Sequence, residues 1–182
     1  FAWSRANPVA ALSGLRKLHG VGGLVAVMAL ASLAQFTLRS SWVLYNTFKF
    51  GWGPAQNGWS LMAVGVMSVI VQGFLLKHLL KRFSPRGLAA FSLIASMCTY
   101  FGFGLASEGW MMYVVIIIGT LLGGGAAAAL QGLVSSAADA TTQGQTMGSV
   151  ASLNSLMATI APLIAAPLLA MAVLAYPLVD TF

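Results

Sequence analysis

The chain has 182 residues, of which 59% are hydrophobic and 7% are charged, and its formal net charge is +6. An ordinary soluble domain has about 25% charged residues, so this composition excludes a soluble globular protein. The uncharged runs between Arg86, Glu108, Asp139 and Asp180 are each at least as long as the roughly 20 residues that a spanning helix needs. A transmembrane β-barrel is excluded as well, because its strands would alternate over about 10 residues. The sequence therefore predicts an all-α membrane protein.

The basic residues lie beside the apolar runs and not along one polar stripe, so we expect no nucleic-acid partner. Lys and Arg next to a membrane span are retained on the cytoplasmic side during insertion. The largest group occupies residues 73–87, and we expect this loop to be cytoplasmic. Its members are Lys77, Lys81, Arg82 and Arg86.

Residues 1–19 are predicted to form an amphipathic lead-in on the cytoplasmic surface, because they combine basic residues with an apolar face. The first span is predicted over residues 20–45 and contains Arg39. An arginine at the centre of the bilayer costs about 2.5 to 3.5 kcal/mol. Two interpretations stay open: an anchor that snorkels to the outer surface beside Trp42 and Tyr45, which is favoured, or a contact to a transported molecule.

Gln35 lies one helical turn inward from Arg39, and Ser32 and Met28 continue the same stripe. This stripe is the first candidate for the face of a cavity. The second and third spans are predicted over residues 59–76 and 88–106. In the third span Ser96 and Thr99 have hydroxyls that can hydrogen-bond to the preceding turn without any functional role.

The fourth span, over residues 110–135, contains Gly119, Gly123 and Gly124. Helix backbones approach closely where side chains are this small, so these glycines predict a helix-packing surface. Gln131 lies on one stripe with Gly124 and Ala128. An amide costs free energy in lipid unless it is partnered, so Gln131 is expected to face protein or water.

The fifth span is predicted over residues 147–172, with kinks at Pro162 and Pro167. Residues 177–182 are expected to form an external tail, and the chain is expected to be a truncated piece of a longer protein. Residues 20–176 thus form one membrane unit with five spans, the N-terminus inside and the C-terminus outside.

The predicted spans contain no Asp, Glu or His, so they offer no obvious proton carrier. The sequence shows no pairing of a nucleophile with a base, which argues against an enzyme. Cys98 is the one cysteine, and no metal site or cofactor is expected.

In this order, four stretches resemble the second half of a major facilitator transporter, in particular the tetracycline-efflux-like drug:proton antiporters. They are residues 5–8 (Arg-Ala-Asn-Pro), residues 42–52 from Trp42 to the Phe-Gly-Trp sequence, residues 129–133 (Ala-Leu-Gln-Gly-Leu), and residues 143–163 from Gln-Gly-Gln to Pro-Leu. The resemblance covers nearly the whole chain.

The resemblance implies that the spans are helices seven to eleven of a C-terminal six-helix half, which rocks against a first half around a central site. Helices seven and ten line that site in the family, which implies that Gln35, Arg39, Trp42 and Gln131 contact the substrate. It also implies a cytoplasmic gating loop. The positions of this loop that match the family are Gly73, Lys81, Arg82 and Arg86, whereas Lys77 and Pro85 stand where an acidic residue is expected.

The function that follows is secondary transport, namely proton-coupled efflux of small amphipathic compounds such as tetracycline-like drugs. Two alternatives stay open: a transporter of the same fold for a sugar, peptide or metabolite, and a membrane scaffold that does not transport. The expected partners are the missing N-terminal half, a small-molecule substrate and the lipid bilayer. The expected location is the cell membrane, which is the inner membrane in a Gram-negative bacterium.

Overall fold

A computed structural model describes residues 22–137 and 143–179 of the chain, and within these ranges the elements are helices joined by short turns, with no strand. The lead-in over residues 1–19 and Asp139 lie outside the described residues. The elements are α2 (Gly22–Phe50), α3 (Pro54–Ile70), a π-helical turn η2 (Val71–Leu75), α4 (Leu76–Arg82), α5 (Pro85–Leu105), α6 (Gly109–Gly123), α7 (Ala126–Ser136) and α8 (Gln143–Val179).

The predicted fold class is confirmed. Within the described residues, five helical stretches are long and apolar enough to cross a membrane. The stretches are Gly23–Phe50, Pro54–Arg82, Pro85–Leu105, Gly109–Ser136 and Gln143–Leu174.

The first turn between spans is shorter than the 46–58 interval that separates the first two predicted spans. The helix α2 continues to Phe50, and α3 begins at Pro54. A proline suits the first turn of a helix because its missing N–H has no partner there anyway. Gly51 has φ 65°, a left-handed conformation that glycine adopts without strain, and it lets the chain leave α2 abruptly.

The chain divides into two compact units, which are described separately. The first unit comprises residues 1–48 and 134–182. In it a small core of Met28 from α2, Val134 from α7 and Val150 from α8 holds the three helices together. A hydrogen bond from Ser32 Oγ to Asn154 Oδ1, 2.8 Å long, joins α2 to α8.

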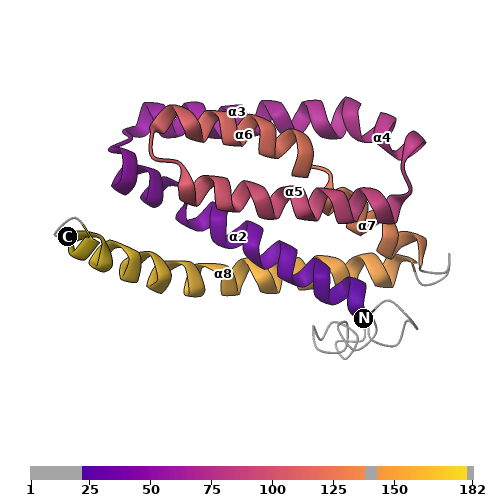
Figure 1. The fold of residues 1–182 in the computed structure, drawn as a ribbon. Helices are drawn as coiled ribbons and strands as arrows, with labels where there is room; N and C mark the ends of the chain where they lie inside the picture. The colour runs from indigo at the N-terminus through magenta and orange to yellow at the C-terminus, as the bar shows by residue number, and fades with distance from the viewer. Residues whose placement is uncertain (1–21, 138–142, 180–182) are drawn as a thin grey trace. The chain divides into compact units, whose positions relative to one another are not determined.

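The second unit comprises residues 49–133. The elements α3, η2 and α4 form one rod, α5 returns along it, and α6 packs against both α3 and α5 (Figure 1). The largest fully buried side chains of this unit come from α3, η2, α5 and α6: Ser60, Val71, Ser92, Met112 and Ile116.

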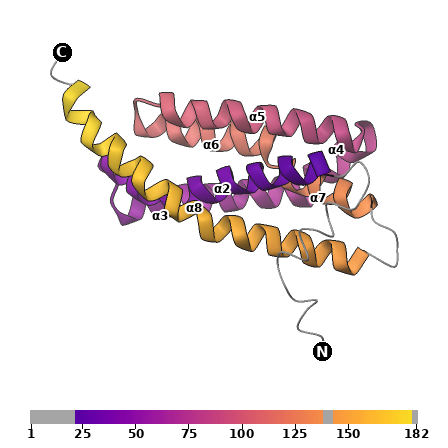
Figure 2. The same ribbon diagram turned by 90° about the horizontal axis from the view of Figure 1, so that it is seen from below.

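The long helix α8 is continuous through Pro162 and Pro167. Figure 2 shows that α8 bends along its length. A proline inside a helix removes one backbone hydrogen bond and clashes with the preceding turn, so a bend is the expected response.

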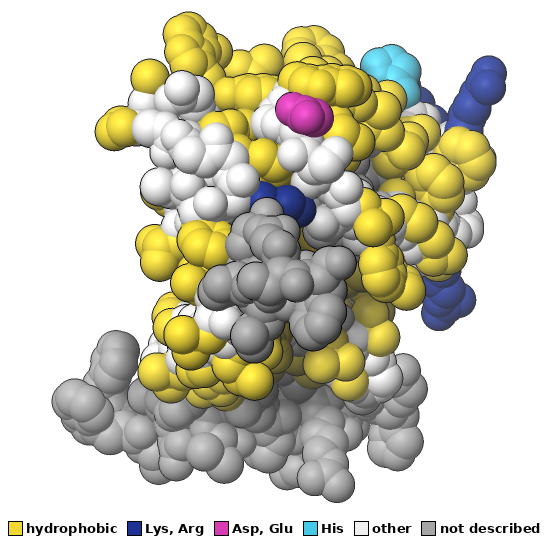
Figure 3. All heavy atoms as spheres, turned by 60° about the vertical axis from the view of Figure 1, so that its left-hand side comes forward, with side chains coloured by type: hydrophobic (Ala, Val, Ile, Leu, Met, Phe, Trp, Pro, Cys, Tyr) yellow, Lys and Arg dark blue, Asp and Glu magenta, His cyan; other side chains and the backbone are white. Residues whose placement is uncertain are grey.

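Large apolar side chains cover much of the surface. Leu105 is 79% exposed, Leu174 is 74% exposed and Leu163 is 71% exposed. Figure 3 shows one such face, on which hydrophobic side chains greatly outnumber charged ones. This surface suits a hydrocarbon environment, where exposed apolar side chains cost nothing. The chain is therefore a multi-pass membrane protein.

Candidate functional site

The residues of the α2 stripe that was predicted to face a cavity lie in two different surroundings. Met28, only 5% exposed, packs in the core with α8, and Ser32 hydrogen-bonds to Asn154 of α8. These two residues therefore hold helices together, as hydroxyl and amide groups do between membrane helices. Gln35, one turn further along, is half-buried.

The second half of the stripe carries polar groups in different surroundings. The Arg39 side chain is exposed, whereas Trp42 is 6% exposed. One turn beyond Trp42, at the helical spacing of the same stripe, Asn46 is fully buried. Both polar atoms of its side chain, Oδ1 and Nδ2, lack a hydrogen-bond partner among the described residues.

Asn46 is a residue that the sequence analysis does not single out, because the first predicted span ends at residue 45. Its signal was its spacing, since Gln35, Arg39, Trp42 and Asn46 follow one another at intervals of three or four residues. A buried polar group without a partner costs about 1 to 3 kcal/mol. The Asn46 amide therefore favours a ligand that can form hydrogen bonds.

The fourth span is not one uninterrupted helix, as the Gly124–Ala128–Gln131 stripe assumed. The helix α6 ends at Gly123, a turn covers Gly124 and Gly125, and α7 begins at Ala126. Glycine lowers helix stability by about 1 kcal/mol relative to alanine, so consecutive glycines are a natural place for a helix to break. Gln131 lies in α7 with an exposed side chain.

The glycines of α6 face the hydroxyl residues of α5. A Cβ atom built on Gly119 would lie 2.6 Å from Thr99 Oγ1, and one built on Gly123 would lie 2.6 Å from Ser96 Oγ. Neither position has room for a methyl group. The hydroxyls themselves donate to the preceding turn of α5, from Ser96 to Ser92 O at 2.8 Å and from Thr99 to Ala95 O at 2.7 Å, which confirms the expected local bonding.

The glycine turn of the fourth span lies against the π-helical turn of the second. A Cβ built on Gly124 would lie 3.3 Å from Val71 Cγ1, and one built on Gly125 would lie 3.4 Å from Leu76 Cδ1. Val71 begins the π turn and Leu76 follows it. Two departures from regular α-helix thus meet at one level of the second unit, and π turns are frequent at functional positions.

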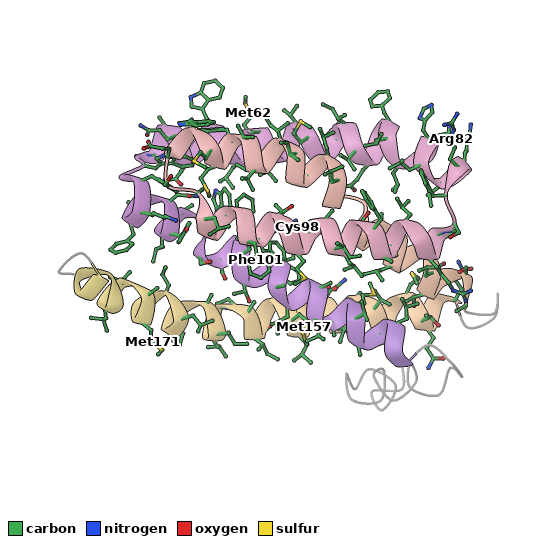
Figure 4. The ribbon with its side chains drawn as sticks, in the orientation of Figure 1. Met62, Arg82, Cys98, Phe101, Met157 and Met171 are labelled. Atoms are coloured by element: carbon green, nitrogen blue, oxygen red, sulfur yellow. The ribbon has the colours of Figure 1, made fainter. Side chains whose placement is uncertain are left out.

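The predicted gating-loop residues lie on either side of a tight turn. Gly73 is in the π turn, Lys81 and Arg82 end α4, and Arg86 is in the first turn of α5. All four are exposed, and Figure 4 labels Arg82 at the end of α4. The turn is fixed by Ser84, whose Oγ accepts the N–H of Gly87 at 3.1 Å and caps α5.

The opposite end of the second unit is held by contacts that the sequence did not predict. Lys49 Nζ donates to Gly104 O at 2.9 Å, which places a cation on the last turn of α5. The Trp52 ring lies 5.3 Å from the Tyr113 ring between centroids, and Tyr113 Oη donates to Gln56 O at 3.1 Å. These contacts link the end of α2 and the turn after it to α5 and α6, and α6 to α3.

A groove of about 450 Å³ lies between α2 and α8 of the first unit, and it contains none of the predicted substrate contacts. Its lining is apolar apart from one threonine hydroxyl. The residues are Val43, Leu44, Thr47, Phe48, Leu169 and Val173.

Comparison with known proteins decides the family. The family model described as Major Facilitator Superfamily matches residues 3–162. The chain belongs to the major facilitator superfamily.

Within this superfamily the chain is similar to tetracycline resistance proteins. It is 33% identical over 155 residues to the class D protein of Salmonella ordonez, with 85% of this chain and 39% of that protein covered. It is 29% identical over 158 residues to the class C protein of Escherichia coli, with 87% of this chain and 40% of that protein covered. The chain thus spans about two fifths of the length of these relatives.

A more distant relative has a different name. The hippocampus abundant transcript-like protein 1 of Homo sapiens is 24% identical over 161 residues, which cover 88% of this chain and 32% of that protein. The two tetracycline resistance proteins named above have higher identities to this chain than this relative has.

Proposed function

We propose that this chain forms the C-terminal half of a secondary transporter that exports small amphipathic compounds, such as tetracycline-like drugs, in exchange for protons. The similarity to tetracycline resistance proteins over 85% of the chain carries this proposal. The transporter works in the cell membrane together with a first half of the same fold. In a Gram-negative bacterium this is the inner membrane.

In this proposal the substrate contacts are Gln35, Arg39, Trp42 and Gln131. Amide groups on membrane helices favour a partner that can hydrogen-bond, and a tryptophan offers a flat apolar surface to a ring. We add Asn46 to the set, since its buried amide has no partner among the described residues. Such a combination suits a compound with both ring and polar groups.

The proton is carried by a carboxylate of the first half. Glu108 is the one Asp or Glu among the described residues, and it is exposed in the turn between α5 and α6, outside the span-length helices. A proton relay inside a membrane needs an ionisable group within the spans. In this proposal the described part of the chain, which has no carboxylate inside a span-length helix, contributes to substrate binding and to movement.

The movement uses the two helix irregularities of the second unit. The π turn and the glycine turn break regular α-helical hydrogen bonding next to each other, so the segments α4 and α7 that follow them can tilt with little strain. One of the moving segments and its connection to α5 then contain the predicted gating residues, which are Gly73, Lys81, Arg82 and Arg86. In this proposal the loop takes part in gating although it contains no acidic residue.

Drug resistance in cells that express the complete transporter tests the proposal. We expect wild type to confer resistance to tetracycline, and Gln131→Ala and Arg39→Ala to reduce it at equal protein level. Gln145→Ala is the matched control, because Gln145 is an exposed glutamine in the first turn of α8 and lies outside the proposed contacts and the two proposed hinge turns. Absence of wild-type resistance would favour another solute or a scaffold, and unchanged resistance in both variants would remove the site assignment.

Transport of a sugar or another polar solute is the second candidate function. The observation that favours it is the number of amides on the α2 stripe, since Gln35 and Asn46 can both hydrogen-bond to hydroxyl groups. Uptake of radiolabelled sugars into vesicles distinguishes it from drug efflux, because drug efflux predicts no sugar uptake above that of empty vesicles.

A further inference from the structure

The connection between α4 and α5 concentrates positive charge on one small surface. Lys77, Lys81, Arg82 and Arg86 are all exposed within ten residues, and His78 lies among them. Lys77 and Lys81 are one helical turn apart on α4, where two like charges destabilise a helix. Arg86 lies in the first turn of α5, where the helix dipole is already positive. The surface therefore favours an anion.

The described part of the chain does not supply that anion. Its one carboxylate, Glu108, follows the far end of α5, a helix of 21 residues. A rise of 1.5 Å per residue places the two ends of α5 about 30 Å apart, and screening at physiological salt acts over about 8 Å. Glu108 is too distant to neutralise the loop.

Apolar side chains interrupt the basic ones on the same surface. Phe74 is 69% exposed, Phe83 is 56% exposed and Leu80 is 43% exposed. A small soluble anion would not contact the exposed phenylalanines. An anionic lipid would, because it has hydrocarbon chains as well as a negative headgroup. The basic residues also end a span-length helix, so they lie at the depth where lipid headgroups are expected.

We propose that this surface binds the headgroup of an anionic phospholipid. Lys77, Lys81, Arg82 and Arg86 contact its phosphate groups, while Phe74, Leu80 and Phe83 contact the upper part of its acyl chains. The lipid supplies the negative charge that the loop itself lacks. This inference depends on the membrane-spanning fold and not on the identity of a transported compound.

Lipid binding to the complete protein, purified in detergent, tests the inference. Phosphatidylglycerol and phosphatidylcholine with identical acyl chains are titrated in turn, and bound lipid is counted by native mass spectrometry. A basic side chain near an anionic surface contributes about a fivefold gain in affinity. We expect the double variant Lys77→Gln/Lys81→Gln to bind phosphatidylglycerol about 25-fold more weakly, with phosphatidylcholine unaffected.

Two controls separate charge from folding and lipid from phosphate. The variant Lys77→Arg/Lys81→Arg keeps both charges and should bind like wild type, and the thermal unfolding midpoint of each variant checks its fold. Inorganic phosphate at millimolar concentration should fail to displace the lipid, because it lacks acyl chains. Equal binding of the two lipids, an undiminished preference in the Gln variant, or displacement by inorganic phosphate would each overturn the inference.

Discussion

The close contact between Gly119 of α6 and Thr99 of α5 gives a prediction whose size follows from the structure. In Gly119→Ala the new Cβ would lie 2.6 Å from Thr99 Oγ1, closer than Cβ atoms come to other heavy atoms, and 3.0 Å from Thr99 Cβ, which is a tight contact. Thr99 cannot simply turn away. Its β-branched side chain is restricted in a helix, and its hydroxyl donates to Ala95 O at 2.7 Å.

Gly132→Ala is the matched control. Gly132 is in α7 of the same span, and nothing lies within 4 Å of a Cβ built there. Both substitutions gain about 1 kcal/mol of helix propensity, so this gain cancels when the two variants are compared. The difference isolates the cost of overpacking, which is about 1 to 3 kcal/mol.

Thermal unfolding of the protein in detergent measures this difference. A change of 1 kcal/mol shifts the melting temperature by about 2 to 4 °C at this chain length, so Gly119→Ala should melt roughly 2 to 12 °C below Gly132→Ala. Adding Thr99→Ala removes the clashing Cγ2 and Oγ1 atoms and should restore much of the loss. If Gly119→Ala and Gly132→Ala have the same melting temperature, or if adding Thr99→Ala does not raise that of Gly119→Ala, the helices do not pack in this way.

Three further predictions concern single polar groups. A double-mutant cycle between Ser32→Ala and Asn154→Ala should give a coupling energy of about 0.6 kcal/mol, with about 1.7 as an upper value; a coupling of zero in unfolding measurements would contradict the bond between α2 and α8. Lys49→Met should lower stability by about 0.3 to 1 kcal/mol, because the last turn of α5 loses a cation at Gly104. Lys49→Arg should keep the melting temperature of wild type, and equal melting temperatures of the two variants would argue against the contact. Asn46→Leu should raise stability by about 1 to 3 kcal/mol, because it removes an unpartnered buried amide, yet lower drug resistance; lower stability would mean that the amide is paired.

The sequence predicts the general architecture well because hydrophobicity over 20 residues is a cumulative signal. Long apolar runs predicted the five helical stretches, and the helical period placed Met28, Ser32 and Gln35 on one face of α2. The period could not tell which partner that face meets. Asn154 bonds Ser32 across 122 residues of sequence, and nothing local records such a pairing.

The interruptions of the helices were not predicted. A run of glycines and alanines is compatible with both a closely packed helix and a broken one, and the choice depends on Val71 and Leu76 packing against the turn. The π turn over Val71–Leu75 has no composition of its own. Asn46 was missed because asparagine near a glycine-rich stretch is typical of a loop, whereas here the helix continues for another turn.

Accessibility of Gln35 and Gln131 to water tests the central claim most directly. In the complete protein, with Cys98 replaced by serine, Gln35→Cys, Gln131→Cys and the control Leu30→Cys are treated in membranes with a membrane-impermeant maleimide. Leu30 is 67% exposed and lies away from the Gln35 stripe of α2. We predict that both glutamine positions react, that tetracycline slows their reaction, and that the Leu30 position stays unlabelled. Glutamine positions as inert as Leu30 would contradict a transporter half whose amides face an aqueous pathway.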